Sequence, residues 1–291
     1  MLSLLHLSPW AWPLIGVPAL AAAVVALQGR LLFGRTWHIR RAAPGPAAAR
    51  RRSEAVWLAR PGGIQLQGWL TVPAEAPPRR LLLWFGGRNE HVAWTPDLAG
   101  WLPDDCALLA FNYRGLGASN GWPGETACVA DAHAAADWGL ARLALPPGAL
   151  HLAGRSLGTG VAMQLAARRA AAGTPVASIA LITPLKSLRA VLRRNPLTAP
   201  LTPWLRSPLD SLAAARALRC EVLVLLAETD RQVPHAHSHH LVDALRRAGS
   251  AVTVHQLAGT NHRSLARTPA AMQHLGSWLP PTPPAAHSSS R

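Results

Sequence analysis

Short, continuous apolar runs recur along the middle and the end of the chain. These runs are four to six residues long, too short to cross a membrane as helices, and lie at Leu81–Phe85, Ala107–Phe111, Leu150–Ala153, Ala177–Ile182 and Val222–Leu226. Uninterrupted apolar runs of this length are typical of strands that are buried on both faces. A further strand is expected at Ala251–Gln256.

Between the apolar runs lie longer segments with helical apolar spacing, at Glu125–Leu145, Leu157–Ala172, His239–Gly249 and Ser264–Leu279. Ahead of them, Ala55–Val72 alternates apolar and polar residues around Pro61-Gly62-Gly63, a pattern that predicts a β-hairpin. Strands that alternate with helices favour an α/β fold, with a mostly parallel sheet and helices on both of its faces. The main domain is expected over residues 54–279, before a disordered Pro- and Ser-rich tail over residues 280–291.

The N-terminal segment is the longest uncharged stretch of the chain. Trp10–Leu27 carries no charge, which is about enough for one membrane-spanning helix. We predict an N-terminal anchor over residues 1–33. A cleaved signal peptide is the alternative, but no Lys or Arg precedes the apolar run. The positive charges all follow this segment, so the main domain is expected on the cytoplasmic side of a single-pass anchor.

Residues 34–53 are rich in Arg, Ala and Pro and predict a linker whose arginines face anionic lipid headgroups. The whole chain has 29 Lys and Arg against 14 Asp and Glu, a formal net charge of +15. We nevertheless expect no specific nucleic-acid partner, because no known nucleic-acid-binding motif organises these charges. The three cysteines, Cys106, Cys128 and Cys220, do not have the spacing of a metal site. They are predicted to be small residues of the protein core, in a protein that resides in a reducing compartment.

The strongest chemical signal is the motif Gly154-Arg155-Ser156-Leu157-Gly158, which follows a predicted strand and opens a predicted helix. A serine on such a sharp turn has a strained backbone. Gly154 and Gly158 must lack side chains, because the strand and the helix approach each other closely there. The turn exposes the hydroxyl and directs the first free helix amides toward it. Ser156 is therefore the predicted nucleophile.

A serine hydroxyl needs a histidine base and a carboxylate that orients the histidine, expected in the order Ser, acid, His. Asp230 follows the strand Val222–Leu226, and His262 follows the last strand. We predict that these two residues complete a catalytic triad, with Glu228 as the alternative acid. The predicted oxyanion hole uses the amides of Gly87 and Leu157, with the Arg88 amide as an alternative to Gly87. Arg88, Asn89 and Glu90 are expected at the mouth of the site, where Arg88 and Asn89 meet the substrate.

The run His235, His237, His239 and His240 raises the possibility of a metal site, since His235 and His239 share one helical face. No pattern for a third ligand lies nearby, so we expect no metal and no organic cofactor.

Together these residues resemble the α/β-hydrolase superfamily, and in particular its small, N-terminally anchored serine hydrolases related to serine aminopeptidase-like and prolyl-oligopeptidase-like domains. The resemblance covers Ala55–Leu279. Besides the predicted triad it rests on Asn112–Ser119, on Glu125 with Asp131, and on Ile182–Leu188, which are similar to supporting loops of that branch. Two positions depart from it: Phe85-Gly86 replaces the usual His-Gly, and Arg219-Cys220-Glu221 lacks a proline that often precedes the strand leading to the acid.

The segment at about residues 189–218 occupies the position where such enzymes insert a lid, and its Pro- and Leu-rich sequence suggests an apolar acyl group. The predicted function is serine hydrolysis of a carboxylic ester or related acyl substrate through an acyl-enzyme. Two alternatives stay open: a serine peptidase or amidase of the same fold, and a membrane-tethered scaffold without turnover.

Overall fold

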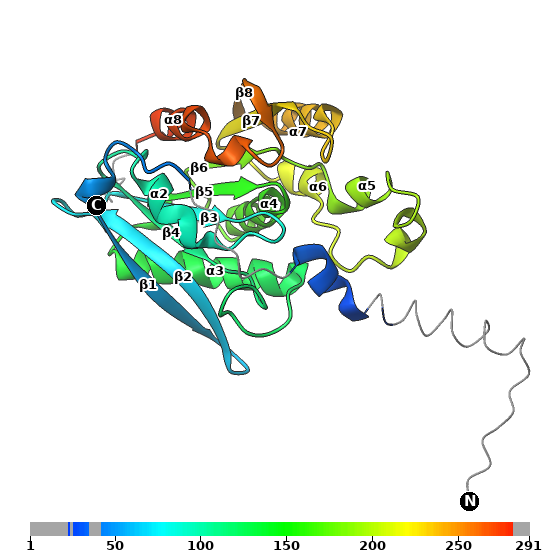
Figure 1. Cartoon of the computed structure of the whole chain (residues 1–291), viewed down its shortest axis with the longest axis horizontal. Coiled ribbons are helices and arrows are strands. Elements are labelled where there is room, and N and C mark those ends of the chain that lie inside the picture. Colours follow the sequence, from blue (N-terminus) through cyan, green and yellow to red (C-terminus); the bar gives the residue numbers. More distant parts are fainter. Residues whose placement is uncertain (1–22, 24–25, 35–41, 282–291) are drawn as a thin grey trace, which may run out of the picture.

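The computed structural model describes residue 23, residues 26–34 and residues 42–281. Its centre is an eight-stranded sheet in the order β1-β2-β4-β3-β5-β6-β7-β8 (Figure 1). The strands are β1 (Arg51–Arg60), β2 (Ile64–Pro73), β3 (Arg80–Phe85), β4 (Cys106–Phe111), β5 (Leu150–Arg155), β6 (Ser178–Ile182), β7 (Glu221–Thr229) and β8 (Ala251–Asn261). The pairings of β1 with β2 and of β2 with β4 are antiparallel, and those from β4 through β8 are parallel. The predicted hairpin and mostly parallel sheet are confirmed.

The central strands are apolar without interruption because both of their faces are buried. On β3, Leu81 and Leu83 belong to the core on one face of the sheet, whereas Leu82 and Trp84 belong to the core on the other. Successive side chains of a strand point to opposite faces, so a strand between two helical layers needs an apolar residue at every position.

Helices cover both faces of this sheet. The core on one face contains apolar residues of α3 (Glu125–Arg142), α4 (Leu157–Ala171), α6 (Ser211–Ala215) and α7 (His235–Ala248). The core on the opposite face contains residues of α2 (Thr95–Ala99) and α8 (Pro269–Trp278). The parallel strands therefore end at one common edge, where the loops that follow β3, β5, β7 and β8 can meet.

Several observed boundaries differ from the predicted ones. The strand β1 begins at Arg51, inside the predicted linker, and α7 begins at His235, four residues before the predicted start. The region before α8 forms a separate short 3-10 helix at Leu265–Arg267, and the five-residue helix α2 was not predicted. Helix ends depend on local capping, and such short helices carry little periodic signal.

Arg51 does not serve the lipid contact that we predicted for the linker arginines. Its side chain is 3% exposed, and its guanidinium donates hydrogen bonds to the carbonyl oxygens of Cys106, Leu102 and Pro103 at 2.6–2.9 Å. Arg51 therefore joins the hairpin to the body of the domain. The arginines at 35, 40 and 41 lie outside the described residues.

Residues 26–33 form a helix that packs on the domain beside the start of α3 (Figure 1). Most of the anchor predicted over residues 1–33 lies outside the described residues, so the anchor stays a prediction. Within residues 26–34 and 42–281, no helix is long and apolar enough to cross a membrane.

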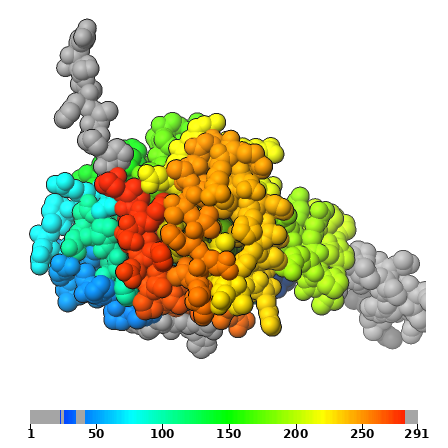
Figure 2. Space-filling model, turned by 90° about the horizontal axis from the view of Figure 1, so that it is seen from above, coloured from blue at the N-terminus to red at the C-terminus, as the bar shows by residue number. Residues whose placement is uncertain are grey.

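The segment predicted as a lid contains α5 (Leu188–Leu192), the 3-10 helix η4 (Ala199–Trp204) and α6. In Figure 2 its yellow-green part projects beyond the body of the molecule. Leu209 of this segment fits against Gly160 on α4, where a Cβ atom would lie 2.8 Å from the Leu209 Cβ.

Candidate active site

Ser156 lies on a sharp turn between β5 and α4, with φ 49° and ψ −116°. A Cβ on Gly154 would lie 2.5 Å from the Gly158 oxygen, and a Cβ on Gly158 would lie 2.2 Å from the Phe85 oxygen. Only glycine fits at either position. The sequence thus builds a strained turn that holds the serine hydroxyl at the carboxyl edge of the sheet.

The structure brings Ser156, His262 and Asp230 into one hydrogen-bonded chain, as the sequence predicted they would meet. The distance from Ser156 Oγ to His262 Nε2 is 2.9 Å, and that from His262 Nδ1 to Asp230 Oδ2 is 2.7 Å. His262 is buried, and Ser156 is half-buried. This arrangement can pass a proton from the hydroxyl to the imidazole while the carboxylate fixes the ring.

The environment of Asp230 keeps its carboxylate charged. Burial raises the pKa of Asp230, but the hydrogen bonds with His262 and from the Val233 and Gln232 amides outweigh burial and leave that pKa below its ordinary value. The two amides donate to Oδ1 at 2.7 and 2.9 Å. Glu228, the alternative acid, instead accepts a hydrogen bond from the Gly259 amide at 2.9 Å. The structure therefore favours Asp230 over Glu228 as the partner of His262.

The loop after β3 does not offer the Gly87 amide that we predicted as an oxyanion donor. That amide donates to Glu90 Oε2 at 2.9 Å, so a carboxylate already occupies it. The Arg88 amide, which was the alternative donor, makes no hydrogen bond to any residue that the structure describes. Leu157 is the first residue of α4, where amides have no carbonyl partner within their own helix. These contacts leave the Arg88 and Leu157 amides available as donors.

Arg88 and Asn89, which were predicted to bind substrate, both contact the N-terminal helix. The Arg88 guanidinium donates to the Leu31 oxygen at 2.9 and 3.2 Å. The backbone amide of Asn89 donates to the backbone oxygen of Phe33 at 3.0 Å. The loop after β3 is thus attached directly to the end of the helix over residues 26–33.

Glu90 is buried behind the site and does not lie at its mouth as predicted. Its Oε2 lies 2.6 Å from Arg155 Nη1, and its Oε1 accepts hydrogen bonds from the indole nitrogens of Trp94 at 3.0 Å and Trp84 at 3.4 Å. Burial raises the pKa of Glu90, but the positive charges of Arg155 and Arg267 and the Gly87 amide outweigh it, so the pKa stays below its ordinary value. Glu90 is therefore a buried anion.

Arg155 connects this anion to the loop that carries His262. Its Nη2 donates to the His262 oxygen at 3.3 Å and lies 3.5 Å from the Arg263 oxygen. No role was predicted for Arg155, which occupies the position just before the serine in the Gly-x-Ser-x-Gly motif.

The histidine run on α7 does not form a metal centre. His235 Nε2 lies 2.8 Å from the Ala227 oxygen, and the His235 and His239 rings pack edge to face at 6.3 Å. In the part of the chain that the structure describes, no group of three His, Cys, Asp or Glu side chains is arranged to hold a metal ion.

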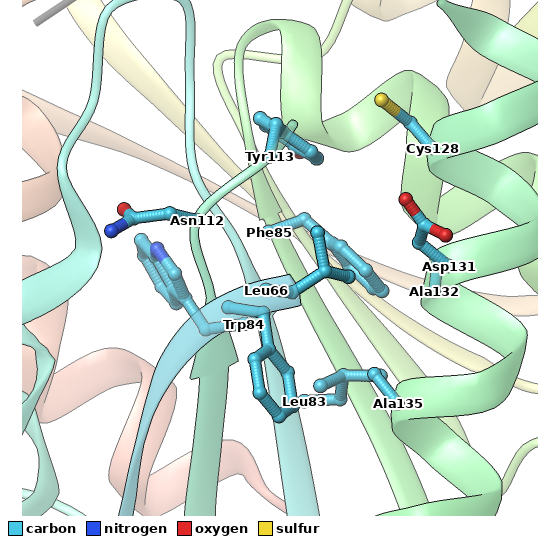
Figure 3. A pocket seen from close by; sticks show the side chains of 11 residues that line it. Leu66, Leu83, Trp84, Phe85, Asn112, Tyr113, Cys128, Asp131, Ala132 and Ala135 are labelled. Carbon is cyan, nitrogen blue, oxygen red and sulfur yellow. The ribbon is translucent and has the colours of Figure 1, made fainter. Parts of the chain in front are cut away.

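A small cavity between β3 and α3 is too small for a substrate. Figure 3 shows Phe85 and Tyr113 on one side of it, with Cys128 and Asp131 opposite on α3. Its volume of about 20 Å³ suits roughly one water molecule. Asp131 is already paired with Arg114 at 2.7 Å and with Arg60 at 3.1 Å, so this cavity lies within the packing of the domain.

Comparison with known proteins agrees with the geometry. Residues 81–206 match a family described as having the alpha/beta hydrolase fold. The uncharacterised protein Rv2307c of Mycobacterium tuberculosis is 28% identical over 80% of this chain and 83% of its own length. The lysophosphatidylserine lipase ABHD12 of Xenopus tropicalis is 29% identical over 59% of this chain, and this chain covers 49% of that protein.

Solved structures extend the likeness at the level of the fold. An α/β hydrolase from Vibrio vulnificus superposes with a TM-score of 0.60 at 21% identity, covering 77% of each chain. A hyperthermophilic esterase from Pyrobaculum calidifontis gives a TM-score of 0.60 at 18% identity and covers 93% of this chain and 97% of its own. The chain therefore has the α/β-hydrolase fold, and the family match and the curated relatives support its place among the α/β hydrolases.

Proposed function

We propose that this protein is a serine hydrolase that cleaves a carboxylic ester or related acyl substrate through an acyl-enzyme. The single observation that carries the proposal is the continuous chain from Ser156 Oγ to His262 to Asp230, with distances of 2.9 and 2.7 Å. The esterases and lipases among the related proteins agree with it.

In the proposed reaction, His262 takes the proton of the Ser156 hydroxyl as the oxygen attacks the substrate carbonyl. The resulting oxyanion accepts hydrogen bonds from the Arg88 and Leu157 amides. The protonated His262 then gives its proton to the leaving alcohol, and the acyl group remains on Ser156. Water, deprotonated by His262, attacks the acyl-enzyme, the serine oxygen recovers its proton, and the acid is released.

Steady-state hydrolysis by the full chain tests this proposal. We expect turnover of p-nitrophenyl acetate and butanoate, and a loss of at least about a thousandfold in kcat for Ser156→Ala. Aminoacyl p-nitroanilides, assayed in parallel, distinguish ester hydrolysis from amide hydrolysis. Faster cleavage of the anilides would favour the peptidase alternative, and no turnover of either class by folded protein would favour the scaffold.

We also propose that the hydrolase domain is tethered to a membrane through Trp10–Leu27, with the domain on the cytoplasmic side. The uncharged length of that segment and the arginines after it support this topology. Alkaline carbonate extraction of membranes should leave the full chain in the pellet and release a chain that lacks residues 1–22. Recovery of the full chain in the soluble fraction would contradict the anchor.

A further inference from the structure

An apolar groove lies between the helix over residues 26–33 and the lid segment. Leu31 and Leu32 line it from the helix, and Leu192, Leu201 and Leu205 line it from the lid. The groove has a volume of about 130 Å³. In Figure 1 the blue helix and the yellow-green lid lie on the same side of the molecule.

The polar side chains that line the groove are engaged with the protein. Thr198 Oγ1 donates to the Leu192 oxygen at 2.6 Å, and Thr202 Oγ1 donates to the Ala199 oxygen at 2.8 Å. Gln28 Oε1 accepts from the Arg206 amide at 2.7 Å. The groove therefore presents mainly hydrocarbon, which favours an apolar ligand over a polar one.

The helix that forms one wall of this groove is fixed by specific contacts. Phe33 is fully buried and packs edge to face on Tyr113 at 5.3 Å. Arg30 stacks on the Trp122 ring at 3.8 Å. Gly29 lies so close to the domain that a Cβ there would be 1.9 Å from the Pro123 oxygen. Residues 26–33 are therefore an integral part of the domain surface.

The same helix is joined to the loop that supplies the proposed oxyanion donor. The Leu31 oxygen accepts from the Arg88 side chain, and the Phe33 oxygen accepts from the Asn89 amide. Tyr113, which packs on Phe33, donates to the Gly86 oxygen at 3.0 Å. Leu31 therefore belongs to the wall of the groove and also contacts the loop that would activate the substrate carbonyl.

Large apolar side chains are exposed around the groove. In the described part of the chain, most of the exposed large hydrophobic residues come from the N-terminal helix, from the lid or from the Trp122 loop: Leu27, Leu31, Trp122, Leu197 and Trp204. An apolar chain that approaches from a lipid phase would meet this surface first.

We infer that the groove binds the hydrocarbon chain of an acyl ester, and that residues 26–33 form one wall of this acyl-binding site. The inference rests on the proposed serine hydrolase function. It assigns to the end of the predicted anchor a second role, in which the segment that would tether the enzyme also selects the substrate.

Two matched pairs of variants in the full chain test this inference. Leu31→Trp and Leu201→Trp fill the groove from its two walls. Leu27→Trp and Leu197→Trp add the same side chain at exposed positions of the same two elements, 43% and 83% exposed, that do not line the groove. The measured quantity is the ratio of kcat/KM for p-nitrophenyl dodecanoate to that for p-nitrophenyl acetate.

We expect both groove variants to lower this ratio by at least about tenfold, because each excluded methylene group weakens transition-state binding. The two exposed variants should keep the wild-type ratio. An unchanged ratio in the groove variants would overturn the acyl-binding site while hydrolysis itself persisted. A folded wild type that hydrolyses neither ester and is not labelled by a fluorophosphonate would instead overturn the proposed function, and the inference with it.

Discussion

Glu90 and Arg155 form a buried ion pair directly behind the proposed nucleophile, with 2.6 Å between Oε2 and Nη1. The carboxylate also holds the Gly87 amide, and the guanidinium also reaches the His262 oxygen. One pair therefore connects the loop after β3, the serine turn and the histidine loop. We interpret Glu90 and Arg155 as positioning residues that keep these three loops in register.

Glu90→Gln should lower both stability and activity. It leaves the Arg155 charge buried without its anion, which costs about 3 kcal/mol in the free energy of unfolding. Urea unfolding measures this loss, and kcat measured on folded protein should fall by at least about tenfold. Asp131→Asn removes the charge that pairs with Arg114 and Arg60, away from the site, and serves as the control. An equal fall of kcat in both variants would show that Glu90 has only a general effect on the fold.

Gly158→Ala should destabilise the serine turn. The added Cβ would lie 2.2 Å from the Phe85 oxygen and 2.5 Å from the Gly86 oxygen, and backbone atoms cannot easily move away. Overpacking of this kind costs about 1–3 kcal/mol. Thermal unfolding should show a Tm lower by several degrees, whereas Gly148→Ala, with no atom within 4 Å of the added Cβ, should unfold like the wild type. A wild-type Tm for Gly158→Ala would contradict the close approach of α4 to β3.

His151 should make the protein less stable at mildly acidic pH. Its side chain is fully buried on β5, with Nδ1 2.8 Å from Ser178 Oγ, and burial followed by the charge of Arg80 lowers its pKa to about 4. In the unfolded chain His151 therefore binds a proton below about pH 6.5, whereas in the folded chain its imidazole stays neutral down to about pH 4. The stability from this residue is complete above pH 6.5 and decreases as the pH falls toward 4.

Between pH 6.5 and pH 5 this effect amounts to about 2 kcal/mol in the free energy of unfolding. Urea unfolding at both pH values measures it. His151→Leu should remove this part of the pH dependence, and His240→Gln, which changes an exposed histidine, should retain it. The same pH dependence in His151→Leu and the wild type would contradict the assignment.

Phe33→Ala should release the helix over residues 26–33 from the domain. Removing a fully buried phenylalanine costs about 3 kcal/mol, which corresponds to a shift of about a hundredfold in the docking equilibrium. Hydrogen exchange of the amides in this helix should accelerate by that factor. Leu27→Ala, which truncates an exposed side chain, should leave exchange unchanged, and equal protection in both variants would show that the helix does not depend on Phe33.

The central sheet and the meeting of Ser156, Asp230 and His262 could be predicted from the sequence, because both depend on patterns that are local. Continuous apolar runs identify the buried strands, and a serine motif between a strand and a helix fixes the edge at which the other two residues must appear. The order of serine, acid and histidine along the chain then restricts the choice.

The role of Glu90 could not be predicted, because its partner Arg155 lies 65 residues away and occupies a position where the serine motif specifies no residue type. The same carboxylate also engages the Gly87 amide, three residues before it in the loop after β3, and the sequence gives no sign of that side-chain contact. The packing of residues 26–33 on the domain could not be predicted either, because their apolar side chains continue the apolar composition of the segment before them.

Covalent labelling of the full chain by a fluorophosphonate, which reacts with activated serines, tests directly whether Ser156 is the nucleophile. We compare the wild type with Ser156→Ala and His262→Ala at equal folded concentration. We expect rapid labelling of the wild type, none of Ser156→Ala, and labelling of His262→Ala that is slower by at least about a hundredfold. Labelling that persists in Ser156→Ala, or a folded wild type that does not react, would contradict that role of Ser156.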